Sequence, residues 1–238
     1  MTKSNKIPIL LLHGSLGAGT QFSALVAQLE AHYDVHLLNF SGHGEMPFSD
    51  NGFNIQVFAA EVLEYLENRQ LDFIHIFGYS MGGYVAMYLA RHYPEKIGKV
   101  MTLGTKYNWN EATAGKEVKR LNPELIEEKV PAFARLLQDR HAANDWKEVV
   151  IRTAQLIEDL GHQSLLKHQD YAQIPSPCML MMGDRDNMVS FQETIEVYNA
   201  LPEAQLTVLP DTAHPLEKAD VPLLAYYIKR FTTQKMES

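Results

Sequence analysis

Short, almost wholly apolar runs alternate along the chain with longer amphipathic segments. Six of these runs have the length of a strand and stop at glycine, proline or polar turn residues. Runs that are apolar at nearly every position are typical of parallel strands buried on both faces, so the pattern predicts a mainly parallel sheet of about six strands. The expected strands are Ile7–His13, Val35–Phe40, Phe73–Gly78, Lys99–Gly104, Met179–Gly183 and Leu206–Leu209.

Helical periodicity fills most of the intervals between these runs. In residues 54–69 an apolar side chain recurs at every third or fourth position, which places one apolar stripe along a helix. The alternation of strand and helix predicts the α/β class with a doubly wound sheet, in which ligands bind beyond the carboxyl ends of the strands. Other expected helices are Gln21–His32, Met81–Tyr93, one beginning after Ser190, and Pro222–Phe231.

The alternation stops between residues 106 and 173. This segment contains no strand pattern, has helical spacing in "NPELIEEKVPAFARLLQDRH", and is too long for an ordinary loop. We therefore expect a helical cap, residues 106–173, inserted into an α/β core formed by residues 1–105 and 174–238. A helical excursion that packs elsewhere on the core is the alternative.

Composition and charge narrow the possible partners. The chain has 238 residues, 46% of them hydrophobic, with a formal net charge of −8, which disfavours nucleic acid and anionic membranes as the main partner. Its single cysteine, Cys178, lies in an apolar run, so no disulfide is expected and a reducing compartment is favoured. The first apolar run, Ile7–Leu12, is too short for a signal peptide or a membrane span. We expect a cytoplasmic monomer or homodimer acting on a small molecule, with the terminal "TTQKMES" frayed.

The stretch "FGYSMGGY" places Ser80 between an expected strand and an expected helix. The pattern Gly78-x-Ser80-x-Gly82 is that of a nucleophile elbow, in which a strained turn exposes a serine. Glycine is needed two positions on either side, because larger side chains would collide there. The amino end of the following helix favours negative charge at the same point.

A serine nucleophile requires a base and a carboxylate that orients it. In an elbow of this kind the carboxylate and then the histidine follow the serine along the chain. Of ten histidines, only His214 lies beyond the last candidate carboxylate. Asp184 and Asp186 both follow the strand expected at 179–183. We choose Asp186, because it lies further into the loop, and expect Asp184 to tie down its own turn.

An oxyanion hole requires two backbone N–H groups that point to one place. We expect one from Met81 and the other from Ser15 in "HGSLG", with Leu16 as the alternative, while His13 holds this loop by hydrogen bonding. Substrate contacts are expected from Leu16, Tyr84, Trp109 and Met188. Further apolar candidates for the pocket wall are Phe22, Met81, Tyr107, Phe133 and Trp146, although such residues more often belong to the core. Arg135, Arg140 and His141 are expected on a solvated helix face, with contact to an anionic substrate as the alternative.

Five segments together resemble the successive signatures of the α/β-hydrolase superfamily: "LLLHGSLG", "GYSMGG", "PEKIGKVMTLG", "GDRDNMV" and "TAHPLEKAD". The resemblance covers nearly the whole chain outside residues 106–173. It implies an esterase-like serine hydrolase with a helical cap and with no metal or organic cofactor. Three features depart from the family: few residues precede the first strand, residues 39–44 lack the usual Asp-x-Arg start, and Tyr84 stands where menaquinone-pathway synthases carry arginine.

The sequence therefore predicts a serine hydrolase with the triad Ser80, Asp186 and His214, which cleaves a carboxylic ester or related acyl bond of a small to medium apolar substrate. Two alternatives remain open: a ligand-binding, receptor-like protein of the same fold, and a carbon–carbon hydrolase or lyase of the menaquinone-pathway type. Metal-dependent hydrolysis has little support, because the histidines show no H-E-x-x-H or similar spacing.

Overall fold

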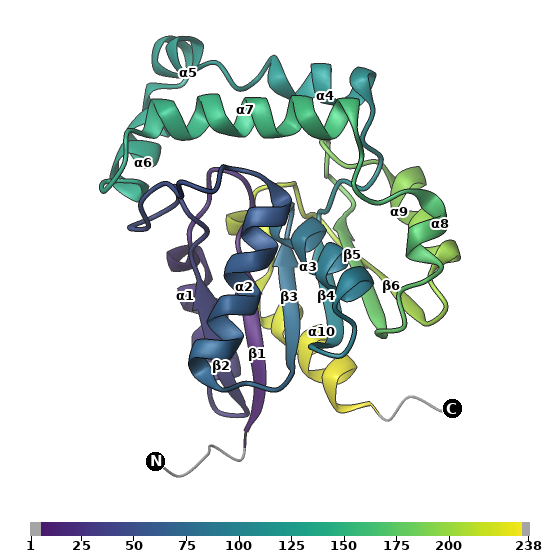
Figure 1. Ribbon diagram of the computed structural model, residues 1–238. Coiled ribbons are helices and arrows are strands. Elements are labelled where there is room, and N and C mark those ends of the chain that lie inside the picture. Colours follow the sequence, from purple (N-terminus) through teal and green to yellow (C-terminus); the bar gives the residue numbers. More distant parts are fainter. Residues whose placement is uncertain (1–5, 235–238) are drawn as a thin grey trace.

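A single parallel sheet organises the chain, as the computed structural model of residues 6–234 shows (Figure 1). The strand order is β2-β1-β3-β4-β5-β6 and every neighbouring pair is parallel. The prediction of a doubly wound parallel sheet with about six strands is confirmed. The strands are β1 Ile7–Leu12, β2 Tyr33–Leu38, β3 Ile74–Tyr79, β4 Ile97–Leu103, β5 Cys178–Gly183 and β6 Ala204–Leu209.

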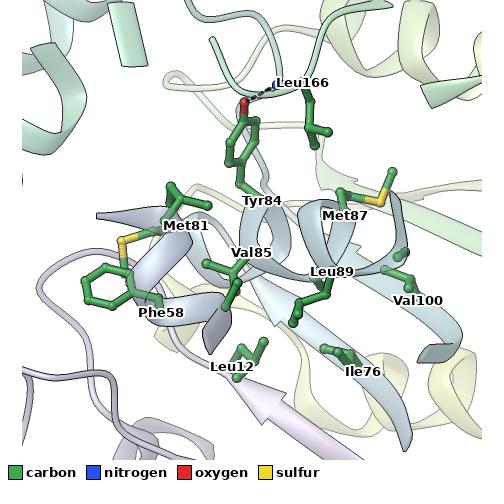
Figure 2. Packing of buried hydrophobic residues seen from close by; sticks show 14 of the residues in the cluster. Leu12, Phe58, Ile76, Met81, Tyr84, Val85, Met87, Leu89, Val100 and Leu166 are labelled. Carbon is green, nitrogen blue, oxygen red and sulfur yellow. Dashed lines mark hydrogen bonds between the residues drawn. The ribbon is translucent and has the colours of Figure 1, made fainter. Parts of the chain in front are cut away.

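The apolar runs bury both faces of the central strands. In β1, Leu10 and Leu12 face one layer of helices, whereas Ile9 and Leu11 face the other, and all four are fully buried. Successive side chains of a strand point to opposite faces, so a strand covered on both sides needs apolar residues at every position. Figure 2 shows the layer in which Leu12 packs against helices of the first face.

Two layers of helices cover the sheet. One layer contains α1 (Ser23–Leu29) and α10 (Val221–Thr233), which pack against each other. The opposite layer contains α2 (Ile55–Arg69), α3 (Met81–His92), α8 (His168–Tyr171) and α9 (Phe191–Ala200). Side chains of Asn54, Ser190 and Asp220 accept hydrogen bonds from the first-turn amides of α2, α9 and α10, which explains where these helices begin.

Two expected helices have different boundaries in the structure. The helix expected over residues 21–32 is a short 3-10 helix, Gly19–Phe22, followed by α1, which ends at Leu29. It ends early because β2 starts at Tyr33, opposite Ile7, and the chain needs the intervening residues to turn. The last helix continues to Thr233, since the buried Thr232 hydroxyl lies 2.5 Å from the Tyr33 hydroxyl. The rest of the expected frayed tail, residues 235–238, lies outside the described residues.

Of the five helices between β4 and β5 in the described residues, the first four lie across the carboxyl ends of the strands (Figure 1). They are α4 (Glu111–Val118), α5 (Pro123–Lys129), α6 (Pro131–Arg140) and α7 (Trp146–His162), and α7 runs along α4. Leu137 and Val149 of this segment form a buried cluster with Leu16 from the loop after β1. The segment therefore contacts the core at the sheet edge where the connections reverse direction, between β1 and β3.

Candidate active site

Ser80 occupies a strained turn at the carboxyl end of β3. Its backbone has φ 50° and ψ −115°, a conformation that is unfavourable for a residue with a side chain. A Cβ at Gly78 would lie 2.4 Å from the Gly82 carbonyl oxygen, and one at Gly82 would lie 2.3 Å from the Leu12 carbonyl oxygen. Both glycines are therefore required by backbone contacts, which lift the Ser80 side chain above the sheet.

His214 and Asp186 meet Ser80 from two other loops. His214 Nδ1 lies 2.8 Å from Asp186 Oδ2, and His214 Nε2 lies 3.3 Å from Ser80 Oγ. Because an ionised carboxylate can only accept a hydrogen bond, Nδ1 carries the proton and Nε2 is free to accept from the Ser80 hydroxyl. The His214 and Asp186 side chains are only 9% and 2% exposed, so water competes little with these bonds.

The Asp186 carboxylate is held in its ionised form. Burial opposes ionisation, but hydrogen bonds from His214 and from the Val189 and Met188 amides outweigh it and lower the pKa of Asp186 below its ordinary value. Asp184 instead accepts from the Thr212 N–H at 3.1 Å, which ties the loop after β5 to the loop after β6.

Gly104 packs closely against Asp186 and His214. It has φ 59°, and a Cβ there would lie 3.2 Å from Asp186 Oδ2 and 3.3 Å from His214 Nδ1. Gly104 also donates to the Met181 carbonyl, which fixes the end of β4 against β5. The sequence identifies Gly104 only as the end of an expected strand.

The two segments expected to supply the oxyanion amides, the loop after β1 and the start of α3, lie beside each other. Met81 is the first residue of α3, where an N–H has no partner within its helix. The loop after β1 turns at Gly14–Gly17, closed by a 3.0 Å bond from the Gly17 N–H to the Gly14 carbonyl. Ser15 lies within this turn, and its Oγ lies 3.4 Å from Met81 Sδ, so the loop is adjacent to the start of α3.

Leu16 gives this loop its unusual shape. Its φ of 57° costs about 1 kcal/mol for a residue with a side chain, so other contacts must hold it. Arg140 Nη1 donates to the Leu16 carbonyl oxygen at 2.8 Å. His141 Nε2 donates to the same oxygen at 3.2 Å, because its Nδ1 accepts from the Gly44 N–H. Both donors come from the end of α6.

The expectation that Arg140 and His141 lie on a solvated helix face is wrong. The Arg140 side chain is 11% exposed and His141 is fully buried. The physical reason is the two-donor contact with the Leu16 carbonyl, which lies 124 residues away along the chain from Arg140 and could not be read from local periodicity. Arg135, on the same helix, is exposed as expected.

Buried histidines stand behind the loop. The ring of His43 lies between those of His13 and His141, with centroid distances of 4.9 and 5.7 Å. His13 donates from Nδ1 to the Gly14 carbonyl and accepts from the Phe40 N–H at Nε2. Burial, with a contribution from the charge of Arg140, lowers the pKa of His13 to about 4, and burial likewise lowers the pKa of His141 to about 4. His13 thus orders the loop as a neutral group.

A cavity of about 710 Å³ opens directly above Ser80 and His214. All four expected substrate contacts line it: Leu16, Tyr84, Trp109 and Met188. Of the further apolar candidates, Met81 and Phe133 line the cavity, while Phe22, Tyr107 and Trp146 do not. Tyr107 is in the core instead, where its hydroxyl lies 2.6 Å from Thr102 Oγ1.

The Tyr84 hydroxyl contacts the chain that leaves α7. It accepts from the Leu166 N–H at 3.1 Å (Figure 2) and lies 3.4 Å from Ser164 Oγ. The side chain is almost completely buried, and burial raises the pKa of this phenol above its ordinary value. Its ring therefore forms part of the cavity wall while its polar atom holds the helical segment to α3.

Lys106 and Glu117 add charged groups to the cavity lining. Lys106 Nζ donates to the Met188 carbonyl at 2.8 Å and lies 3.7 and 3.8 Å from carboxylate oxygens of Glu117 and Glu193. Lys106 and both glutamates have side chains that are 13% exposed or less. This ion cluster connects α4 and α9 to the chain that follows β4, where the helical segment begins.

Comparison with known sequences identifies the family of this chain. The sequence model of the alpha/beta hydrolase fold family matches residues 7–143. The chain belongs to this family. A pimeloyl-[acyl-carrier protein] methyl ester esterase from Aeromonas salmonicida is 30% identical over 98 residues, which are 41% of this chain and only 37% of that protein.

Two further comparisons extend over most of the chain. An sn-1-specific diacylglycerol lipase from Mus musculus is 25% identical over 232 residues, 87% of this chain and 74% of the lipase. The crystal structure of the enol-lactonase from Burkholderia xenovorans LB400 has a TM-score of 0.78 at 17% identity, covering 98% of this chain and 94% of that one. At this identity the likeness is one of fold.

This member of the alpha/beta hydrolase fold family anchors its 39–44 loop without an Asp-x-Arg pair. Asn39 Oδ1 accepts from the Gly19 N–H at 2.7 Å, and Glu61 accepts from the Ser41 N–H at 3.0 Å. The Phe40 N–H also donates to His13 Nε2, so the loop is tied by hydrogen bonds to the segment after β1 and to α2. No helix of residues 6–234 is both long and apolar enough to cross a bilayer.

Proposed function

We propose that the protein is a serine hydrolase that cleaves a carboxylic ester or a related acyl bond through a triad of Ser80, His214 and Asp186. The observation that carries this proposal is the continuous relay from Asp186 through both nitrogens of His214 to Ser80 Oγ. A structural serine on a surface turn needs neither a strained backbone nor an imidazole oriented by a buried carboxylate. The names of the esterase and lipase relatives agree with this chemistry.

In the first half of the proposed reaction, Ser80 Oγ attacks the substrate carbonyl carbon while its proton passes to His214 Nε2. Asp186 stabilises the imidazolium that forms. The carbonyl oxygen becomes an oxyanion and accepts from the N–H groups of Met81 and Ser15, with the Leu16 N–H as the alternative to Ser15. When the tetrahedral intermediate collapses, the alcohol leaves with the proton from His214 and Ser80 retains the acyl group.

The second half repeats the first with water in place of the serine. His214 Nε2 removes a proton from water, and the resulting hydroxide attacks the acyl-enzyme carbonyl. The same amides stabilise the second oxyanion, and collapse returns the proton to Ser80 Oγ and releases the carboxylic acid. No other group is required for either proton transfer.

The proposed substrate has a small to medium, largely apolar acyl part. Leu16, Phe133, Leu156 and Met188 give the cavity apolar walls next to Ser80, and its volume of about 710 Å³ is ample for an acyl chain. We propose that α4–α7, within the segment expected as a cap at residues 106–173, cover this cavity, because they supply much of its lining, whereas α8 of that segment packs in the helix layer beside the sheet.

The test is turnover of a p-nitrophenyl ester series of increasing acyl length by the wild type, Ser80→Ala and Ser23→Ala. Ser23 is an exposed serine of α1 and serves as the matched control. We expect Ser80→Ala to lose turnover and labelling by a fluorophosphonate probe, while Ser23→Ala retains both. Ester turnover that persists in Ser80→Ala would refute the assignment of Ser80 as the nucleophile.

The same labelling tests the receptor-like alternative. A receptor-like protein has no need of an activated serine, so a wild type that resists the fluorophosphonate would favour that reading. A hydrolase of the menaquinone-pathway type would need an arginine at position 84. Here the Tyr84 hydroxyl is already bonded to the Leu166 N–H and unavailable for a substrate carboxylate.

A further inference from the structure

Arg140 connects two loops whose relative positions matter for the proposed reaction. From the end of α6 its Nη1 donates to the Leu16 carbonyl at 2.8 Å, and its Nη2 lies 3.3 Å from Glu217 Oε1. Leu16 belongs to the loop that carries the candidate oxyanion amide of Ser15. Glu217 lies three residues after His214. One guanidinium thus spans both sides of the site.

A second side chain closes this connection. Gln21 Nε2 donates to Glu217 Oε1 at 2.8 Å, and Gln21 Oε1 accepts from the Ala18 N–H at 3.0 Å. The loop after β1, the loop after His214 and the end of α6 therefore share one hydrogen-bonded network. Arginine suits its centre, because the rigid fork of donors can serve two acceptors in fixed directions.

The backbone of the loop explains why it needs an external support. Leu16 adopts φ 57°, a conformation that L-residues with side chains rarely occupy. A loop in this conformation relaxes unless its carbonyl is held, and relaxation would turn the peptide planes of Ser15 and Leu16. Arg140 and His141 hold that carbonyl from the same side.

We propose that Arg140 is a positioning residue for the oxyanion hole, which aligns the amide of the Ser15–Leu16 loop with that of Met81 through the Leu16 carbonyl. The inference rests on the proposed serine-hydrolase function. It makes the helical segment part of the catalytic geometry, since the oxyanion hole is complete only while the end of α6 contacts the loop. Arg140 itself touches no reacting atom in this scheme.

The test compares Arg140→Met with Arg135→Met, at an exposed arginine on the same helix. With p-nitrophenyl butyrate, Arg140→Met should lower kcat by about 10- to 100-fold with KM within about twofold, because removal of a whole oxyanion donor costs about 10²- to 10³-fold. The inhibition constant of phenylboronic acid, which forms a tetrahedral adduct with the serine, should rise in parallel. Arg135→Met should match the wild type.

Arg140→Lys is the second variant, in case Arg140→Met does not fold. A lysine reaches only one of the two acceptors, so we expect a kcat loss of about tenfold at unchanged thermal midpoint. The inference is overturned if the folded Arg140 variants match Arg135→Met in kcat, or if they raise KM alone and leave boronate inhibition unchanged. A wild type without Ser80-dependent turnover would instead refute the proposed function, and this inference with it.

Discussion

The buried His13 predicts a specific loss of stability in mild acid. Its ring is fully buried, with Nδ1 donating to the Gly14 carbonyl and Nε2 accepting from the Phe40 N–H. Protonation of Nε2 would destroy the second bond and place a cation beside His43, His141 and Arg140. The native state therefore keeps His13 neutral, with a pKa of about 4 against an ordinary value of 6.5.

The sign and size follow from proton linkage. Between pH 6.5 and about 4 the unfolded chain binds a proton at His13 and the native protein does not, so the free energy of unfolding falls as pH falls through this window. Once the pH is below both pKa values, a pKa shift of this size lowers the free energy of unfolding by roughly 3 kcal/mol. About 2 kcal/mol of this is lost between about pH 7 and about pH 5. This loss of free energy is the contribution of His13. The other buried histidines with lowered pKa values make further contributions of the same sign.

Urea unfolding at the two pH values, followed by tryptophan fluorescence, measures this loss. We expect the difference between the two pH values to be about 2 kcal/mol smaller in His13→Gln than in the wild type. His32→Gln, at an exposed histidine, controls for removal of an imidazole as such. Equal pH dependence in the wild type and His13→Gln would refute the reasoning, as would an NMR titration in which native His13 protonates near its ordinary pKa.

Two further predictions concern the triad and a helix end. Asp186→Asn should lower kcat about 10⁴-fold, since an amide no longer holds the proton on His214 Nδ1, whereas Asp184→Asn should stay within about tenfold of the wild type. Similar losses at both positions in steady-state ester hydrolysis would contradict this distinction. Gln70 ends α2 at φ 55° and is exposed, so Gln70→Gly should raise the free energy of unfolding by about 1 kcal/mol over Gln70→Ala. Urea unfolding that ranks these two variants equally would contradict it.

The sequence by itself determined the sheet and the elbow, because both depend on neighbouring residues. A strand buried on two faces must be apolar throughout, as β1 is. Gly78 is forced by backbone contacts within one strand–turn–helix unit, whereas Gly82 is forced by the Leu12 and His13 carbonyls at the end of the neighbouring strand β1. The order of serine, acid and histidine then predicted Asp186 and His214 as the partners of Ser80, since the loops after parallel strands meet at one edge of the sheet.

Only the tertiary structure decided which polar residues of the helical segment matter. Arg135 and Arg140 lie on one helix and look alike in sequence, yet one is solvated and the other holds the Leu16 carbonyl. Tyr84 lines the cavity as its sequence position suggested, but the bond from the Leu166 N–H to its hydroxyl could not be read from the sequence. Helical periodicity identifies an apolar stripe, but it cannot say which distant backbone carbonyl a charged side chain will meet. That contact depends on where α6 packs against the core.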